Sequence, residues 1–210
     1  SVTALSILKL LSKNSKTSVS GKILFKNKDI LAIPEKKLMD IRGKKISMIF
    51  QEPMTSLNPL HTIKKQIIEC LENGVNKKKD DQEKKCINLI NLVGIKEAKT
   101  RLDDYPHQLS GGHSQRIMIA MAIANNPDIL IADEPTTALD VTIEAQILEL
   151  LESIKAEFNM SMIYISHDLA VIGEISDRIL VMYLGRVVES GFADEVIDNP
   201  LHPYTRALLK

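Results

Sequence analysis

Two hydrophobic rhythms alternate along the chain. Short, nearly continuous apolar runs at residues 129–132 and 162–165 are typical of strands buried on both faces of a parallel sheet. Between them, residues 141–157 show apolar positions at the spacing of a helix. Strands that alternate with helices of this length predict an α/β fold with a mostly parallel core sheet.

The other elements are predicted from the same periodicities and from the turn-forming residues between them. In chain order they are a helix at 1–11, short edge strands at 21–25 and 29–31, a strand at 45–50, helices at 63–71, 84–93, 114–124 and 168–175, and a hairpin-like pair of strands at 178–189. Residues 52–115 combine helical spacing with polar connectors. We therefore expect a helical subdomain there, within a single domain that spans residues 1–210.

Composition supports one domain and narrows its partners. A chain of 210 residues with 44% apolar residues is large enough for one sizeable core. The 27 basic residues balance 27 acidic ones, so the bulk charge gives no indication of nucleic acid as a partner. The longest apolar run, residues 117–124, is far shorter than the roughly 20 residues of a membrane span. Cys70 and Cys86 lack ligand spacing, so we expect free thiols in a reducing compartment.

Each predicted core strand ends next to a residue with useful chemistry. Gln51 follows one strand, Asp133 and Glu134 follow the next, and His167 comes just after the third. Singly, each has an ordinary explanation, because aspartate forms turns, glutamine is often exposed and most histidines are structural. Ligands of parallel sheets bind beyond the carboxyl ends of the strands, so together these residues predict one polar site.

The two acidic residues suit different tasks. Asp133, after four apolar residues, is placed to hold Mg²⁺, directly or through water, because a cation that bridges phosphates needs few protein ligands. Glu134 would point elsewhere and would polarise an attacking water.

A serine and two glycines, Ser110, Gly111 and Gly112, open an apolar helix. A hydroxyl, exposed backbone N–H groups and the positive end of a helix dipole together suit a phosphate. The alternative is a plain helix N-cap, which explains Ser110 but gives no reason for two glycines. This segment, residues 110–112, is called the signature turn below.

These motifs, in this order, resemble the nucleotide-binding domain of an ABC transporter, which has a P-loop NTPase-like fold. Finer similarity to the oligopeptide, dipeptide and nickel importer ATPases lies in residues 50–59, 105–108, 133–141 and 199–209. The chain is most similar to the first half of double-ATPase subunits of peptide uptake systems, which carry a second ATPase half in the same chain.

The resemblance implies that two such domains sandwich two ATP molecules, each between the phosphate loop of one domain and the signature turn of the other. It implies that Gln51 and Asp133 organise Mg²⁺ and that Glu134 acts on water. It further implies that His167 contacts the terminal phosphate, and that Asp140 communicates across the dimer.

The resemblance also implies partners. Residues 52 to about 108 would receive a coupling helix of an integral-membrane permease, at the cytoplasmic face of the cell membrane. An extracytoplasmic solute-binding protein would act indirectly, and nucleic acid would have no part. Import of peptides or of a related small solute is the implied function.

Ser1 fits the last position of a phosphate loop, where its hydroxyl would coordinate Mg²⁺. No glycine-rich loop ending in Gly-Lys-Ser occurs in the chain, so we expect the N-terminal strand and most of that loop to be missing. Loss of one preorganised donor costs roughly 3 kcal/mol of transition-state stabilisation. We therefore expect this chain alone neither to bind ATP tightly nor to turn it over.

Two adjacent positions depart from the pattern of the family that the chain resembles. His113 and Ser114 stand where relatives usually carry Gln or Met followed by Arg, which puts the efficiency of the signature turn in question. Residues 166–168, Ser-His-Asp, are not expected to form a hydrolase triad, because consecutive residues point in different directions. The alternative functions are a catalytically inactive fragment or remnant, and a non-transport ABC-type ATPase; the latter would be expected to show a coiled-coil insertion or a basic linker.

Overall fold

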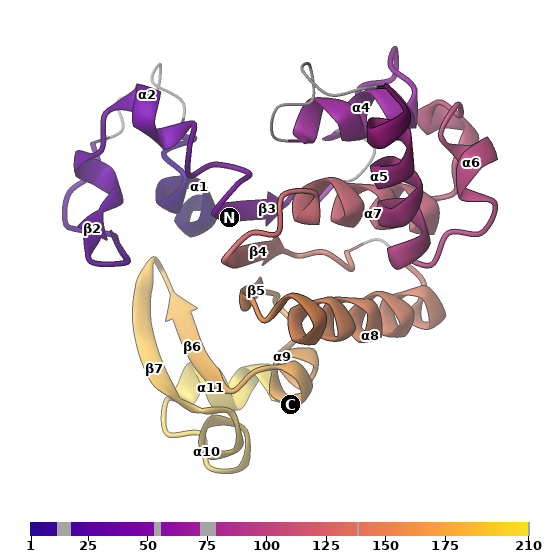
Figure 1. Cartoon of the computed structure of the whole chain (residues 1–210). Coiled ribbons are helices and arrows are strands. Elements are labelled where there is room, and N and C mark those ends of the chain that lie inside the picture. Colours follow the sequence, from indigo (N-terminus) through magenta and orange to yellow (C-terminus); the bar gives the residue numbers. More distant parts are fainter. Residues whose placement is uncertain (12–17, 53–55, 72–78, 138, 210) are drawn as a thin grey trace. The chain divides into compact units, whose positions relative to one another are not determined.

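The computed structural model describes the chain except for residues 12–17, 53–55, 72–78, 138 and 210 (Figure 1). Contacts within the chain divide it into two compact units, Ser1–Ile163 and Tyr164–Lys210. Each unit is described by itself.

Three strands form the central sheet, in the order β3, β4, β5. They are β3 (Ile46–Ile49), β4 (Ile129–Asp133) and β5 (Ser161–Ile165). β3 and β4 are parallel, with Ile46 opposite Ile129 and Ile49 opposite Ala132. Every residue of β3 is buried, and so is every residue of β4 after the first. The three predicted core strands are present and the α/β class is confirmed, but burial of the third strand on both faces is wrong. In β5, an outer strand of the sheet, Ser161 and Ile163 are exposed and the other residues are half-buried.

Helices surround this sheet within the first unit. They are α1 (Val2–Ile7), α2 (Glu35–Leu38), α4 (Ile63–Cys70), α5 (Lys79–Leu92), α6 (Ala98–Arg101), α7 (Gly111–Ile123) and α8 (Val141–Phe158), with 3-10 turns at Ile30–Ala32 and Pro106–Gln108. Helices α7 and α8 lie side by side over the same face of the sheet (Figure 1). Their first turns are therefore neighbours, although 30 residues separate their starts in the sequence.

The predicted edge strand at 29–31 is wrong in its second half. Strands β1 (Leu24–Phe25) and β2 (Lys28–Asp29) pair only with each other, and a 3-10 turn follows. The carboxylate of Asp29 causes the change, since its Oδ1 accepts hydrogen bonds from the backbone N–H of Leu31 and of Ile23, each at 3.1 Å. A side chain that caps the backbone in this way ends the strand.

Helix α1 is shorter than the predicted 1–11 and is anchored at its end by two cations. Lys9 Nζ donates to the carbonyl oxygens of Leu31 at 3.0 Å and Ile33 at 3.1 Å. Arg42 donates to the carbonyl oxygens of Leu8 at 2.6 Å and Lys9 at 2.9 Å. The Arg42 bonds satisfy carbonyl groups that the end of α1 leaves without partners, and the Lys9 bonds tie the end of α1 to the 3-10 turn at Ile30–Ala32.

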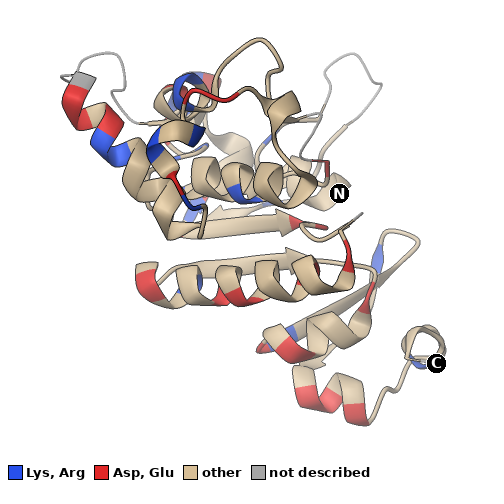
Figure 2. Ribbon diagram, turned by 90° about the vertical axis from the view of Figure 1, so that its right-hand side faces the viewer, with Lys and Arg blue, Asp and Glu red and all other residues tan. Residues whose placement is uncertain are grey.

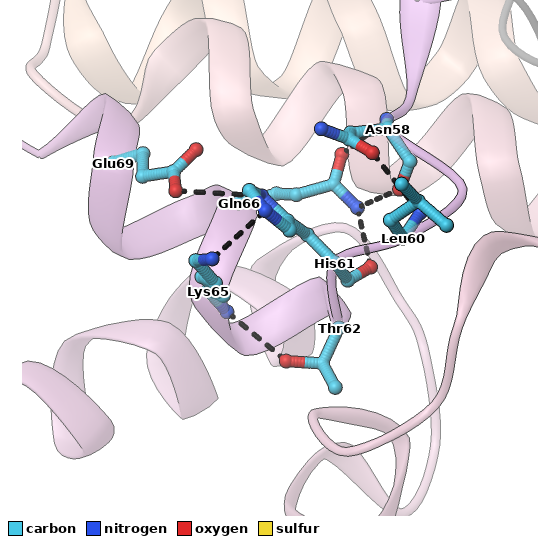
Figure 3. A network of polar contacts seen from close by, with 7 residues as sticks. All are labelled: Asn58, Leu60, His61, Thr62, Lys65, Gln66 and Glu69. Atoms are coloured by element: carbon cyan, nitrogen blue, oxygen red, sulfur yellow. Dashed lines mark hydrogen bonds and ion pairs between the residues drawn. The ribbon is translucent and has the colours of Figure 1, made fainter.

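The loop before α4 is held by one buried glutamine, Gln66, which is 4% exposed (Figure 3). Its Oε1 accepts from the N–H of Asn58 at 2.8 Å, and its Nε2 donates to the carbonyl oxygens of Asn58 at 3.1 Å and His61 at 2.9 Å. These bonds fix the loop while Leu60, at its tip, stays 81% exposed.

One basic residue links α4 to the next helix. Lys64 forms an ion pair with Glu83, which joins α4 to α5. Both signs of charge lie along α5, where Asp80 and Asp81 precede Lys84 and Lys85 (Figure 2). Among the residues that the structure describes, no helix is long and apolar enough to cross a membrane.

The second unit is built on a hairpin of β6 (Arg178–Tyr183) and β7 (Arg186–Phe192), which confirms the predicted pair of strands. Its helices are α9 (Leu169–Ile175), α10 (Ala193–Asp198) and α11 (Pro203–Leu208). A small apolar core joins them, made of Leu169, Ile179, Val181, Ala193 and Val196.

Glu189 on β7 organises the segment that leads into α11. Its carboxylate accepts from the N–H of Leu201 at 2.7 Å, the N–H of His202 at 3.0 Å and the hydroxyl of Thr205. The hydroxyl of Thr205 is the main cause of a lowered pKa at Glu189, and the two backbone N–H groups lower it further.

Both cysteines are free thiols, as expected from their spacing. Burial raises the pKa of Cys70 to about 11 and that of Cys86 to about 11. Thiolate is the reactive form, so neither side chain is set up for nucleophilic or metal chemistry.

Candidate functional site

Predicted site residues meet at the carboxyl end of β4. Asp133 is its last residue and is 4% exposed, and its carboxylate contacts the backbone nitrogen of Ser1. Gln51, two residues beyond β3, donates from Nε2 to Glu134 Oε2 at 2.9 Å. Adjacent parallel strands thus bring Gln51, Asp133 and Glu134 to one edge of the sheet, beside Ser1.

Glu134 adopts a left-handed backbone conformation, with φ of 49°. A non-glycine residue in this region costs roughly 1 kcal/mol, so the surroundings must hold it there. Thr137 does so twice, because its hydroxyl donates to Glu134 Oε2 at 2.8 Å and its N–H donates to the Glu134 carbonyl at 3.2 Å. The carboxylate of Glu134 is thereby oriented by two donors, from Gln51 and from Thr137.

The signature turn starts α7 as a capped helix. Ser110 is the N-cap, and its Oγ accepts from the N–H of His113 at 3.3 Å. Ser110 and Gly111 are exposed. The first N–H groups of a helix of this length present a positive end to an anion. The turn therefore serves as an N-cap and still offers the donors that a phosphate needs.

Gly112 is explained by packing against α8. A Cβ built on Gly112 would lie 3.1 Å from Cγ2 of Ile143, closer than side chains normally pack, whereas one on Gly111 would meet only Leu139, at 4.0 Å. Asp140 fixes the first turn of α8, since its Oδ1 accepts from the N–H of Ile143 at 2.9 Å. Asp140 and the signature turn are thus joined through Ile143 within one domain.

Two polar residues on α7 were missed by the sequence analysis. Gln115 is 1% exposed, and its Nε2 donates to the carbonyl oxygen of Pro135, just after Glu134. Arg116 donates to the carbonyl oxygen of Val93 at 2.7 Å and to Oε1 of Gln146 at 3.1 Å. The available signal was their position in a helix that is otherwise apolar and buried, where a polar side chain must find a partner.

A cavity of about 530 Å³ opens beside Ser110 and His113. Its lining includes the cations Lys96, Arg101 and Arg116 and one carboxylate, that of Glu97. The excess of positive charge beside the exposed signature turn favours an anion there.

His167 belongs to the second unit, in the segment between β5 and α9. Its neighbours serve the backbone: Ser166 Oγ accepts from the N–H of Asp168 at 3.0 Å, and Asp168 caps α9 by accepting from the N–H of Ala170 at 2.9 Å. Ser166 and Asp168 thus have structural partners in the backbone of this segment. A role for His167 at a phosphate stays a prediction.

The donor set at Asp133 fits Mg²⁺. Among the described residues, no group of three or more His, Cys, Asp or Glu side chains could hold a metal. Mg²⁺ that bridges phosphates uses one or two protein carboxylates and keeps water, so a single buried carboxylate is sufficient. Gln51 donates through Nε2, so Oε1 is the atom with which it would bind a metal.

The family model of the ABC transporters matches residues 6–137. A peptidoglycan transport ATP-binding protein, YejF of Agrobacterium fabrum, is 54% identical over 209 residues, which are 100% of this chain and 38% of that protein. The oligopeptide transport ATP-binding protein OppD of Bacillus subtilis is 48% identical over 209 residues, 100% of this chain and 58% of that protein. The chain thus spans less than two thirds of these relatives.

Solved structures of similar fold come from the same family. The protein cbiO1 of Clostridium perfringens, part of the ABC transporter complex cbiONQ, superposes with a TM-score of 0.76 at 30% identity, over 94% of this chain and 74% of that one. The dimeric ATP-binding cassette MJ0796, in a post-hydrolysis state bound to ADP and Pi, gives a TM-score of 0.69 at 28% identity, over 83% and 74% of the two chains.

Proposed function

Because this chain belongs to the ABC transporter family, we propose that it supplies the ATP-binding and ATP-hydrolysing part of a transporter that takes up peptides or a related small solute. The observation that carries the proposal is the meeting of Gln51 and Glu134 next to the buried Asp133, at the sheet edge where ligands of parallel sheets bind. The names of the peptide and oligopeptide transport relatives support the choice of solute.

The proposed division of labour follows from the contacts. Asp133, Oε1 of Gln51 and the hydroxyl of Ser1 would hold Mg²⁺, which when bound supplies charge neutralisation to the phosphates. Glu134 would accept the proton of the attacking water, with its carboxylate oriented by the donors from Gln51 and Thr137. His167 would contact the terminal phosphate.

The signature turn would serve a nucleotide held by a second ATPase domain, in the same or another chain. Ser110 and Gly111 are exposed, and the cavity beside them is lined by three cations and one carboxylate, so an anion can approach from outside the domain. Asp140, exposed at the start of α8, would report on the same interface, because it is joined to Gly112 through Ile143.

The lobe of residues 52–108 would receive the coupling helix of a membrane permease. The loop that Gln66 fixes supports this role, since it is rigidly held and yet presents Leu60 to solvent. The domain would then lie at the cytoplasmic face of the membrane, with a solute-binding protein on the other side.

ATP hydrolysis by the complete subunit tests the proposal. Glu134→Gln keeps the size of the side chain and removes the base, so kcat should fall by about 10²-fold or more while ATP still binds. Glu149→Gln makes the same change on an exposed part of α8 and should hydrolyse ATP like the unaltered subunit.

Two results would contradict the proposal. Full hydrolysis by Glu134→Gln would exclude the proposed base. Peptide uptake that is unchanged in cells lacking the gene would exclude peptides as the solute.

A further inference from the structure

We propose that Gln115 is a positioning residue for Glu134, and that through it the signature turn and the catalytic carboxylate of one domain move as one piece. This inference rests on the proposed function, because it concerns the same ATP-hydrolysing site. It assigns a role to a side chain that lies outside the set of nucleotide-contacting residues.

The contact that carries the inference is a buried hydrogen bond. Gln115 Nε2 donates to the carbonyl oxygen of Pro135, across 20 residues of sequence. Both residues are buried, and Gln115 is 1% exposed. A side chain so enclosed does not reach a nucleotide that binds from outside, so its effect on catalysis is indirect.

Pro135 follows directly on Glu134, whose left-handed backbone needs support from outside. Thr137 supports that residue from one side and Gln51 holds the end of its carboxylate. Gln115 holds the backbone on the C-terminal side of Glu134. The carbonyl oxygen of Pro135 is buried away from water and needs a donor from the protein, which Gln115 supplies.

A second contact ties the same two segments together. Gly112, one turn before Gln115 on α7, packs so closely against Ile143 that a Cβ there would lie 3.1 Å from Cγ2 of Ile143, tighter than side chains normally pack. The residues between β4 and the first turn of α8 are therefore joined to α7 at both of their ends, through Pro135 and through Ile143.

A mechanical consequence follows for a pair of domains. When a nucleotide held by the other domain contacts the signature turn, the resulting shift of α7 reaches Glu134 of this domain through Gln115. Engagement of one site thus sets the position of the base at the other, without a contact between the two nucleotides.

The test uses the complete subunit and Gln115→Met, which keeps the length of the side chain and removes the amide. We expect kcat to fall by roughly tenfold to a hundredfold, because small misplacements of a catalytic group have effects of this size. Affinity for ATP, measured by titration, should stay within about twofold, since Gln115 does not touch the nucleotide.

A double-variant experiment separates positioning from a merely structural role. In a Glu134→Gln background the base is already absent, so Gln115→Met should cause no further loss of kcat. If the methionine variant does not fold, Gln115→Asn, which keeps the amide but shortens it by one methylene, takes its place with the same expectation.

Asn125→Leu is the matched control. Its amide nitrogen also donates to backbone carbonyl oxygens, those of Gly43 and Cys70, but it lies beyond the opposite end of α7 from the signature turn, so its loss should leave kcat unchanged.

Three outcomes would overturn the inference: an unchanged kcat in Gln115→Met, an equal further loss in the Glu134→Gln background, or a loss of ATP affinity that matches the loss of kcat. An unaltered subunit that hydrolyses no ATP would instead overturn the proposed function, and the inference with it.

Discussion

At the scale of single residues, two neighbouring buried polar side chains of α7 affect the stability of the fold differently. Gln115 has a hydrogen-bond partner, whereas the Oγ of Ser114, fully buried beside it, has none within the described part of the chain. A buried polar atom without a partner lowers stability by about 1–3 kcal/mol. Ser114 is therefore a weak point of the helix.

Ser114→Ala should leave the free energy of unfolding unchanged or raise it by about 1 kcal/mol, because it removes the unsatisfied hydroxyl and alanine favours helices. Urea unfolding followed by circular dichroism measures the difference. A clear loss of stability would show that the hydroxyl has a partner.

The two glycines of the signature turn should respond differently to the same change. Gly112→Ala places a methyl group 3.1 Å from Ile143 and should destabilise the domain by about 1–3 kcal/mol. Gly111→Ala has ordinary space, with its nearest neighbour at 4.0 Å, and should be neutral or stabilising. Thermal unfolding of both variants tests this.

The cause of the Gly112 effect can be checked in an Ile143→Ala background. Removal of the isoleucine side chain opens the space, so Gly112→Ala should cost much less there. An equal cost in both backgrounds would mean that the contact with α8 is not the reason for the glycine.

At the scale of elements, the ion pair of Lys64 and Glu83 gives the α4–α5 pair a pH response. The hydrogen bond from Lys64 lowers the pKa of Glu83, and the hydrogen bond to Glu83 raises the pKa of Lys64. The lowered pKa stabilises the fold above the usual value of 4.5, and this is lost as pH falls through the folded-state pKa. The raised pKa of Lys64 stabilises the fold below the usual value of 10.5, and this stabilisation is lost as pH rises through the raised folded-state pKa.

Glu83→Gln should therefore lower stability at neutral pH, and the difference from the unaltered chain should shrink towards both extremes of pH. Urea midpoints across the pH range test this, with exposed Glu157→Gln on α8 as a control that should show no such profile. A difference that stays constant with pH would exclude the ion pair as its cause.

At the scale of the whole molecule, the second unit has its own core and its own organising residue. Glu189 gathers the segment before α11 through the N–H groups of Leu201 and His202 and the hydroxyl of Thr205. The pKa of Glu189 is lowered from its usual value of 4.5. The hydrogen bonds of its carboxylate therefore stabilise this segment above pH 4.5, and this stabilisation is lost as pH falls through the lowered pKa.

Glu189→Ala should speed hydrogen exchange at the amides of Leu201 and His202 and leave β3 and β4 of the first unit as protected as before. Thr205→Val, which removes only the hydroxyl, should have a smaller effect in the same place. Faster exchange throughout both units would show that they unfold together.

Local periodicity decides which helices and strands could be predicted from the sequence. β3, β4 and the hairpin were found because each is a local apolar pattern with clear turn residues at its ends. α2 and α6 were missed because helices of four residues are too short to show a period. The 3-10 turn after Asp29 depends on a side chain that bonds its own backbone, which periodicity does not register.

The same limit applies to the site. The neighbourhood of Gln51 and Glu134 could be predicted, because strand ends share an edge. The contacts of Gln115 with Pro135 and of Gly112 with Ile143 could not, since each joins distant segments through tertiary packing. Why the signature turn needs its second glycine became clear only from the neighbour across the helix pair.

The left-handed backbone at Glu134 sets two selective pressures against each other. Glycine or asparagine would relieve the strain at this position, so survival of heating alone favours them. Under the proposed function, growth that depends on solute uptake favours glutamate. A library of variants selected only for heat resistance should therefore lose glutamate at residue 134. A library selected also for growth of the cell on the transported solute should keep it.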